Sequence, residues 1–225
     1  MQFKNLLVLG AAISSAAATA DLSAVPRNAI ERFLGKPEPV ASRSLEARGL
    51  GNAIFENRCS YDVWIWSVDG KGSSGAKLVP KRTKYTEPVR TSCPGCGVVI
   101  KVSKTNQIVN GKHTQFEYTV GDKLWYDISY VNCAKDKSAD NCPGHEKGNA
   151  MQGLDKDCGQ ANCRGGTYCP EQSYYVDQPL IKLGIKEPVF ACPVQKLSGD
   201  ISMRLCSDEK PLAKRSVAGR LLIDE

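Results

Sequence analysis

Ten cysteines are the residues of this sequence with the greatest capacity for chemistry, and all of them lie between Cys59 and Cys206. In an exported chain an even number of cysteines indicates a disulfide framework, whereas in a cytosolic chain it would indicate metal or redox chemistry. The segment Cys93-Pro94-Gly95-Cys96 could in isolation be half of a zinc site or a redox motif. A redox pair of the thioredoxin type begins a helix, however, and residues 97–102 have the composition of a strand. The cysteines therefore predict up to five disulfide bonds and no metal site.

The two histidines, His113 and His145, offer little for nucleophilic catalysis. A cysteine nucleophile would have to lie outside the disulfides, contrary to the even count. His145 follows Pro143 and Gly144, and we identify no partners that would give it a metal-binding role. We predict that it is a solvent-exposed loop histidine, and we expect no cofactor.

The ends of the chain predict export and processing. Residues 1–20 contain Lys4, an apolar run at 6–13 and a small-residue ending at Ala18-Thr19-Ala20, as in a signal peptide. The apolar run is only about ten residues long, against the roughly 20 that a spanning helix needs. We interpret residues 21–48 as a pro-segment, 49–209 as one folded domain, and 210–225 as a tail with a dibasic site at Lys214-Arg215. We expect a secreted or wall-associated monomer with no transmembrane segment.

The net charge of +6 is spread along the chain. A nucleic-acid-binding protein would show a basic stripe with interleaved aromatic residues, and export is a further argument against that function. We therefore expect no nucleic-acid partner.

From residue 53 onward, short segments with a two-residue period alternate with Gly, Pro and Asn. This pattern predicts an all-β sandwich. The strands are predicted at 53–57, 61–68, 84–90, 97–103, 114–119, 124–131, 189–192 and 201–205. The segment 61–68 is apolar on both faces, which predicts an interior strand covered on each side. Residues 134–166 lose the alternation and predict a loop-rich insert that is ordered by cross-links.

Four collinear motifs resemble those of thaumatin-like proteins. They lie at 53–64, 115–118, 123–129 and 168–177, and the chain ends in the family's manner with Cys192-Pro193 and residues 203–206. The resemblance covers residues 51–209. It is still closer to the small fungal branch of yeast-phase-specific and spore-wall thaumatin-like proteins, in which Glu-Tyr-Thr and Trp-Tyr-Asp-Ile-Ser recur.

The resemblance implies a β-sandwich with a shortened, disulfide-rich loop lobe. It also implies three disulfide pairs, Cys59 with Cys206, Cys158 with Cys192, and Cys163 with Cys169. The other four cysteines have no clear family counterparts. For them we choose the local pairs Cys93 with Cys96 and Cys133 with Cys142.

Larger family members have an acidic cleft implicated in binding, and sometimes slowly hydrolysing, β-1,3-glucan. The resemblance places Glu117 and Asp127 in such a cleft, and strand alternation puts Trp125 on the face of Asp127. Alternation within 113–119 predicts that His113 and Glu117 share an exposed face. The alternative for Asp127 is a structural hydrogen bond to the backbone of a neighbouring strand.

Three departures from the family weaken an enzymatic assignment, and one of them is the shortening of the loop lobe that walls the cleft. Asn132 replaces a further cleft acid, and the basic partner has no arginine counterpart near Val102. The leading hypothesis is therefore a non-enzymatic binder of wall polysaccharide, such as β-glucan, or of an extracellular host or competitor surface protein. The alternatives are a weak β-1,3-glucanase that uses Glu117 and Asp127, and a structural protein without carbohydrate affinity.

Overall fold

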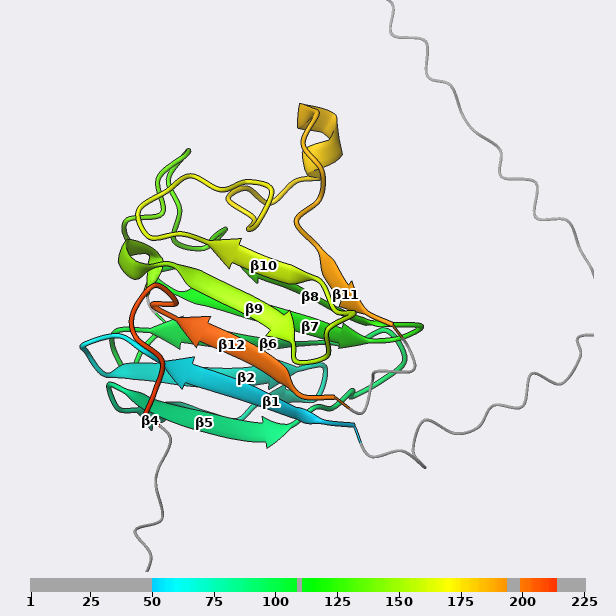
Figure 1. Ribbon diagram of the computed structural model, residues 1–225, viewed down its shortest axis with the longest axis horizontal. Helices are drawn as coiled ribbons and strands as arrows, with labels where there is room; N and C mark the ends of the chain where they lie inside the picture. Colours follow the sequence, from blue (N-terminus) through cyan, green and yellow to red (C-terminus); the bar gives the residue numbers. More distant parts are fainter. Residues whose placement is uncertain (1–49, 109–110, 194–198, 214–225) are drawn as a thin grey trace, which may run out of the picture. The chain divides into compact units, whose positions relative to one another are not determined.

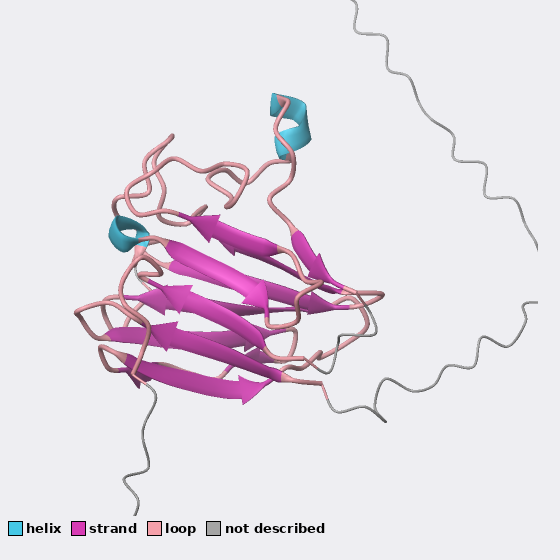
Figure 2. Ribbon diagram, in the orientation of Figure 1, coloured by secondary structure: helices cyan, strands magenta, loops and turns pink. Residues whose placement is uncertain are grey.

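The computed structural model describes residues 50–108, 111–193 and 199–213. The expected signal peptide (1–20), the pro-segment (21–48) and the dibasic Lys214-Arg215 lie outside these residues. Within them, the regular structure is almost entirely β-strand, arranged in two sheets (Figures 1 and 2). The predicted all-β sandwich is confirmed.

One sheet has five strands, which neighbour one another in the order β10-β9-β12-β1-β5. They are β1 (Asn52–Asn57), β5 (Thr83–Pro88), β9 (Asn149–Gly153), β10 (Gln160–Cys163) and β12 (Ile201–Leu205). The first and last strands, β1 and β12, pair in parallel, and the other pairs are antiparallel. The two ends of the folded region therefore meet in the middle of this sheet.

The second sheet has seven strands in the order β11-β8-β7-β6-β2-β3, with β4 also paired to β2. They are β2 (Val63–Asp69), β3 (Gly72–Ser73), β4 (Lys77–Val79), β6 (Gly97–Ser103), β7 (Thr114–Val120), β8 (Leu124–Ser129) and β11 (Phe190–Cys192). All its pairs are antiparallel. Its central strands, β6, β7 and β8, form the platform on which the candidate site is built.

The core lies between the two sheets, because alternate residues of each strand point inward. Phe55 of β1 meets Phe116 of β7 edge to face, with ring centroids 5.9 Å apart. In β2, Val63 and Ile65 are buried whereas Trp64 and Trp66 are only half-buried. The prediction that this strand is covered on both sides is therefore wrong. The sheet has one inner face and one outer face, and the tryptophans lie on the outer one.

The prediction that residues 134–166 form a loop-rich insert is wrong in part, because β9 and β10 lie within it. Ala150 and Met151 of β9 are fully buried, and β9 pairs with both β10 and β12. Small and polar residues form this strand because its neighbours supply ladder partners on both edges. Packing of β9 therefore orders this segment together with the cross-links.

His145 is also placed differently from its prediction as an exposed loop residue. It begins the short 3-10 helix η3 (His145–Lys147) and is only 2% exposed. Its Nε2 donates to the carbonyl of Thr167 at 3.0 Å, and its ring meets that of Tyr130 edge to face. The tight turn at Gly144 directs the imidazole into the protein. A second 3-10 helix in the described residues, η4 (Leu180–Leu183), stands beyond the sheets in Figure 2.

Five disulfide bonds join all ten cysteines. The pairs are Cys59 with Cys206, Cys93 with Cys96, Cys133 with Cys142, Cys158 with Cys192, and Cys163 with Cys169. The first pair ties the end of β1 to the end of β12, and the fourth ties the turn after β9 to β11 in the opposite sheet. Of the helices in the described part of the chain, none is long and apolar enough to cross a membrane.

Candidate functional site

Two carboxyl side chains lie next to each other on the outer face of the seven-stranded sheet. Glu117 of β7 and Asp127 of β8 are directly opposite in the ladder. They face outward because the flanking residues, Phe116 and Tyr118 in β7, point into the core. Residues directly opposite each other on one face have Cβ atoms about 4.5–5.5 Å apart. The register of the sheet therefore makes these two acids neighbours.

The surroundings of the pair favour its protonated form. Burial raises the pKa of Asp127 to about 8, and the negative charge of Glu117 is a second cause. Burial also raises the pKa of Glu117, although the ammonium group of Lys101 on β6 acts in the opposite direction. Two carboxylates this close cannot both ionise without a large cost. The raised pKa of Asp127 therefore favours its protonated form near neutral pH, in which the carboxyl group can both donate and accept hydrogen bonds.

These shifts also bear on the alternative role for Asp127. A carboxylate that accepts hydrogen bonds from backbone N–H groups would have its pKa lowered. The pKa of Asp127 is set by burial and by the charge of Glu117, both of which raise it, and a backbone hydrogen bond is not among its causes. The structure thus favours a group facing the cleft over a structural bond to a neighbouring strand.

A cleft of about 670 Å³ opens above the pair. Nine of its twelve lining residues have polar side chains; the lining comprises Gln115, Glu117, Asp127, Ser129, Val131, Asn132, Tyr174, Val176, Asp177, Gln178, Pro179 and Glu187. The sheet forms the floor, and the segment 174–187 forms the wall. Four carboxyl groups therefore line one cleft. Among the described residues, no group of three or more His, Cys, Asp or Glu side chains is arranged to hold a metal ion.

Tyr174 is fixed to the sheet by backbone hydrogen bonds. Its N–H donates to Ile128 at 2.9 Å, and its carbonyl accepts from the N–H of Tyr130 at 2.8 Å. These bonds extend the sheet by one parallel bridge between Ser129 and Tyr174. Burial raises the pKa of the Tyr174 hydroxyl, as do its hydrogen bond to Glu187 and the carboxylates on the floor. The phenol therefore stays protonated with its proton directed to Glu187, and its oxygen can accept a hydrogen bond at the cleft wall.

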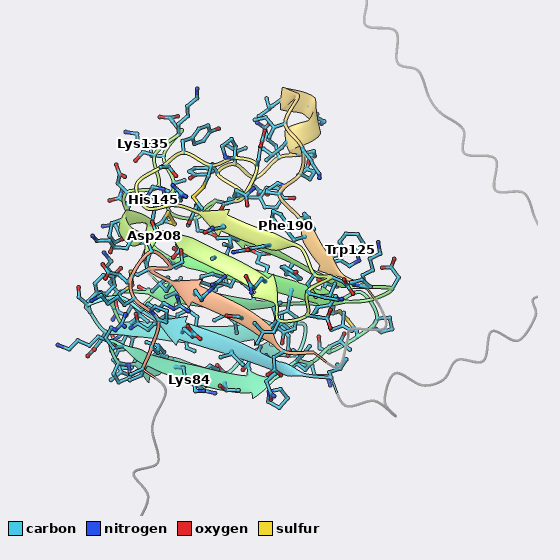
Figure 3. The ribbon with its side chains drawn as sticks, viewed as in Figure 1. Lys84, Trp125, Lys135, His145, Phe190 and Asp208 are labelled. Carbon is cyan, nitrogen blue, oxygen red and sulfur yellow. A yellow bond between two sulfur atoms is a disulfide. The ribbon has the colours of Figure 1, made fainter. Side chains whose placement is uncertain are left out.

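A smaller hollow of about 190 Å³ adjoins the pair on the side away from Tyr174. It is lined by Gly97, Val98, Val99, Glu117, Tyr118, Thr119, Trp125, Tyr126, Asp127 and Val189. The indole of Trp125 is 37% exposed, and its Nε1 donates to Asp122 at 2.9 Å. The ammonium nitrogen of Lys123 lies 5.2 Å from the centroid of the Trp125 ring. Figure 3 shows Trp125 at the edge of the molecule near Phe190.

The residues expected at the cleft are only partly brought together. Glu117 and Asp127 line both hollows, and Trp125 lines the smaller one. His113 lines neither and is 3% exposed, so its placement on an exposed face is wrong. His113 precedes β7 in a tight turn, where its N–H donates to the carbonyl of Gly111 at 2.7 Å. It therefore does not share the outward face of β7 with Glu117. Burial lowers the pKa of its imidazole, as does the charge of Lys101.

Several cleft residues were not identified from the sequence. Asn132 lies where the family acid was expected, but Asp177 and Glu187 bring other carboxyl groups to the cleft. Lys101 adjoins Val102 and supplies positive charge beside Glu117, although no arginine is present there. Tyr174 belongs to one of the four motifs, and that motif was the signal that could have placed it in the site.

Comparison with known proteins identifies the family. Residues 41–207 match the family described as Blastomyces yeast-phase-specific protein. The antigenic thaumatin-like protein of Arthroderma benhamiae is 29% identical over 137 residues, which cover 58% of this chain and 63% of that relative. The secreted thaumatin-like protein calA of Emericella nidulans is 28% identical over 167 residues, which cover 73% of this chain and 84% of that one.

Two solved structures are similar at lower identity. The protein elicitor MoHrip2 from Magnaporthe oryzae has a TM-score of 0.48 and 19% identity, over 69% of this chain and 98% of that one. The thaumatin-like xylanase inhibitor TLXI has a TM-score of 0.42 and 9% identity, over 68% of this chain and 98% of that one. With the family match over most of the described residues, the chain belongs to the yeast-phase-specific family, a small fungal branch of the thaumatin-like proteins.

Proposed function

We propose that this protein is secreted or wall-associated and binds a neutral, hydroxyl-rich polysaccharide such as wall β-glucan in the cleft, without hydrolysing it. The observation that carries the proposal is the polar cleft above Glu117 and Asp127. Export is supported by the five disulfide bonds, which persist in oxidising compartments, and by the signal-like residues 1–20.

The lining of the cleft favours a ligand rich in hydroxyl groups. Pockets for drug-like molecules are lined mainly by apolar side chains with a few polar groups. Here nine of the twelve lining residues have amide, hydroxyl or carboxyl side chains set among apolar surface, as a sugar with polar edges and apolar C–H faces requires, and a protonated Asp127 adds a donor among acceptors. The floor is a hydrogen-bonded sheet and the wall is pinned to it at Tyr174. Such a site is ordered before binding, which lowers the entropic cost of holding a flexible ligand.

The positions of the two acids favour binding over hydrolysis. In glycosidases two carboxyl groups flank the scissile bond, one acting as the acid and the other as the base or nucleophile. Glu117 and Asp127 instead stand side by side on one floor, so both approach a ligand from the same side. The second candidate function is nevertheless a weak β-1,3-glucanase. The raised pKa of Asp127 favours it, because a general acid must keep its proton near neutral pH.

The test is binding of the oxidised, purified protein to insoluble β-1,3-glucan, chitin and wall fractions, measured by sedimentation and then by calorimetry with soluble glucan. We expect Glu117→Gln and Tyr174→Phe each to weaken glucan binding by roughly tenfold, a loss of about 1.4 kcal/mol. The exposed residue Glu171 is outside the cleft, and Glu171→Gln serves as the matched control.

Each outcome separates the candidate functions. Binding without release of reducing sugar supports the proposal. Sugar release that disappears in Glu117→Gln supports the glucanase. If the wild-type protein sediments with none of the three materials, carbohydrate binding is wrong, and a structural role or a protein partner replaces it.

A further inference from the structure

The acid pair is shared by two hollows, and this arrangement extends the candidate site beyond the cleft. Glu117 and Asp127 line both the 670 Å³ cleft and the 190 Å³ hollow beside Trp125. Trp125 precedes Asp127 by two residues on the same face of β8, a step of about 6.6 Å along the strand. The distance from the acid pair to the indole is therefore about the length of one sugar residue, so a glycan bound at the pair can contact Trp125 with its next residue.

Gly97 lines the smaller hollow and adds no side chain to it. Gly97 stands opposite Thr119 in the ladder, and Thr119 stands opposite Trp125. A Cβ atom at Gly97 would lie 3.0 Å from the hydroxyl oxygen of Thr119. The hollow holds the liquid volume of about six water molecules, which is comparable with the bulk of one hexose residue.

The walls of this hollow combine an aromatic surface with charges of both signs. Trp125 is oriented by its hydrogen bond to Asp122 and remains partly exposed, while Val99 and Val189 add apolar surface. An exposed indole suits the apolar C–H face of a sugar ring. The acid pair repels an anionic ligand, and Lys123 beside the indole repels a cationic one. A neutral ligand meets neither penalty.

We propose that the hollow beside Trp125 is a second subsite, which takes the next residue of a linear neutral glycan whose preceding residues contact Glu117, Asp127 and Tyr174. This inference rests on the proposed function. It adds that the ligand crosses the acid pair, and that affinity depends on chain length.

The experiment is calorimetric titration of β-1,3-gluco-oligosaccharides of increasing length into the wild-type protein and two variants. Trp125→Ala removes the aromatic surface, and Gly97→Val fills the hollow without altering Trp125. We expect both variants to bind the long oligosaccharides roughly tenfold more weakly, and to bind the short ones, which occupy only the cleft, as the wild type does. Trp125→Phe should be intermediate. Ligand-dependent quenching of indole fluorescence should also be lost in Trp125→Phe.

Tyr168→Ala is the matched control, since Tyr168 is an exposed aromatic residue outside both hollows. Thermal unfolding of every variant checks that it is folded. Wild-type affinity for all lengths in Trp125→Ala and Gly97→Val, together with loss of binding in Glu117→Gln, would overturn the subsite and leave the cleft proposal intact. If the wild type binds no length, the proposed function and the subsite fail together.

Discussion

At the scale of single residues, the Glu117 and Asp127 pair couples the cleft to pH. The folded protein raises the pKa of Asp127 from 3.8 to about 8, chiefly through burial. It therefore holds this proton more tightly than the unfolded chain does. By linkage, the stability associated with the proton is fully present below about pH 4 and is lost as pH rises to about 8.

We predict that Asp127→Asn stabilises the protein at pH 8 and has little effect at pH 3, because the amide never has to be ionised in the fold. A difference of one in pKa corresponds to about 1.4 kcal/mol. Allowing for solvent at the open side of the cleft, we expect a gain of about 2 kcal/mol, or roughly 4–8 °C in Tm. Thermal unfolding across this pH range measures it. The control is Asp157→Asn, at an exposed turn residue. An equal effect of Asp127→Asn at both pH values would contradict the raised pKa of Asp127.

Site residues in regular strands could be predicted from the sequence, and site residues in irregular segments could not. Glu117 and Asp127 lie in regular strands within recognisable motifs, so the family resemblance placed them together, and the ladder pairs them directly. Asp177 and Glu187 lie in an irregular segment that reaches the cleft only because Tyr174 bridges to β8. Sequence periodicity contains no information on such a contact. His113 was misplaced because alternation was extended one residue beyond the start of β7.

At the scale of elements, strands with a clear two-residue period were predicted and the others were not. Each of the eight predicted segments overlaps a strand of the structure. The four that were missed are β3 and β4, which are very short, and β9 and β10, which are rich in Asn, Gln, Gly and Ala. Strand β9 forms because β12 and β10 pair with its two edges, so tertiary context overrides a weak local propensity.

The role of β9 in the core gives a prediction for Met151. This side chain is fully buried opposite Met203 of β12 and Ala161 of β10. Met151→Ala should lower the free energy of unfolding by about 2–5 kcal/mol, because it removes buried apolar surface and leaves a cavity. Urea unfolding measures the loss. Leu154→Ala is the matched control, since Leu154 is 53% exposed just beyond the same strand, and it should change stability by less than about 0.5 kcal/mol. Similar small losses in both variants would mean that the segment does not contribute to the core.

At the scale of the whole molecule, the disulfide bonds differ in the length of the chain segment that each one closes into a loop. The Cys59 and Cys206 bridge spans 147 residues and joins the parallel strands β1 and β12 at the centre of one sheet. The Cys93 and Cys96 bridge spans three residues in a surface turn before β6. Constraint of the unfolded chain grows with the length of the loop that is closed, so the two bonds should contribute very differently.

We predict that replacing Cys59 and Cys206 together with serine lowers the free energy of unfolding by about 5 kcal/mol, against about 2 kcal/mol for the same change at Cys93 and Cys96. The first pair also lies in the core, where both cysteines are 1% exposed, so buried hydroxyl groups add to the loss. Denaturant unfolding of the two double variants under identical conditions gives the comparison, and the short-loop variant serves as the control. Because β1 joins β5 to β12, loosening its end should also increase hydrogen exchange across the five-stranded sheet. Equal losses in the two variants, with exchange unchanged, would contradict the dependence on loop length and would show that the long bridge constrains the domain no more than the short one.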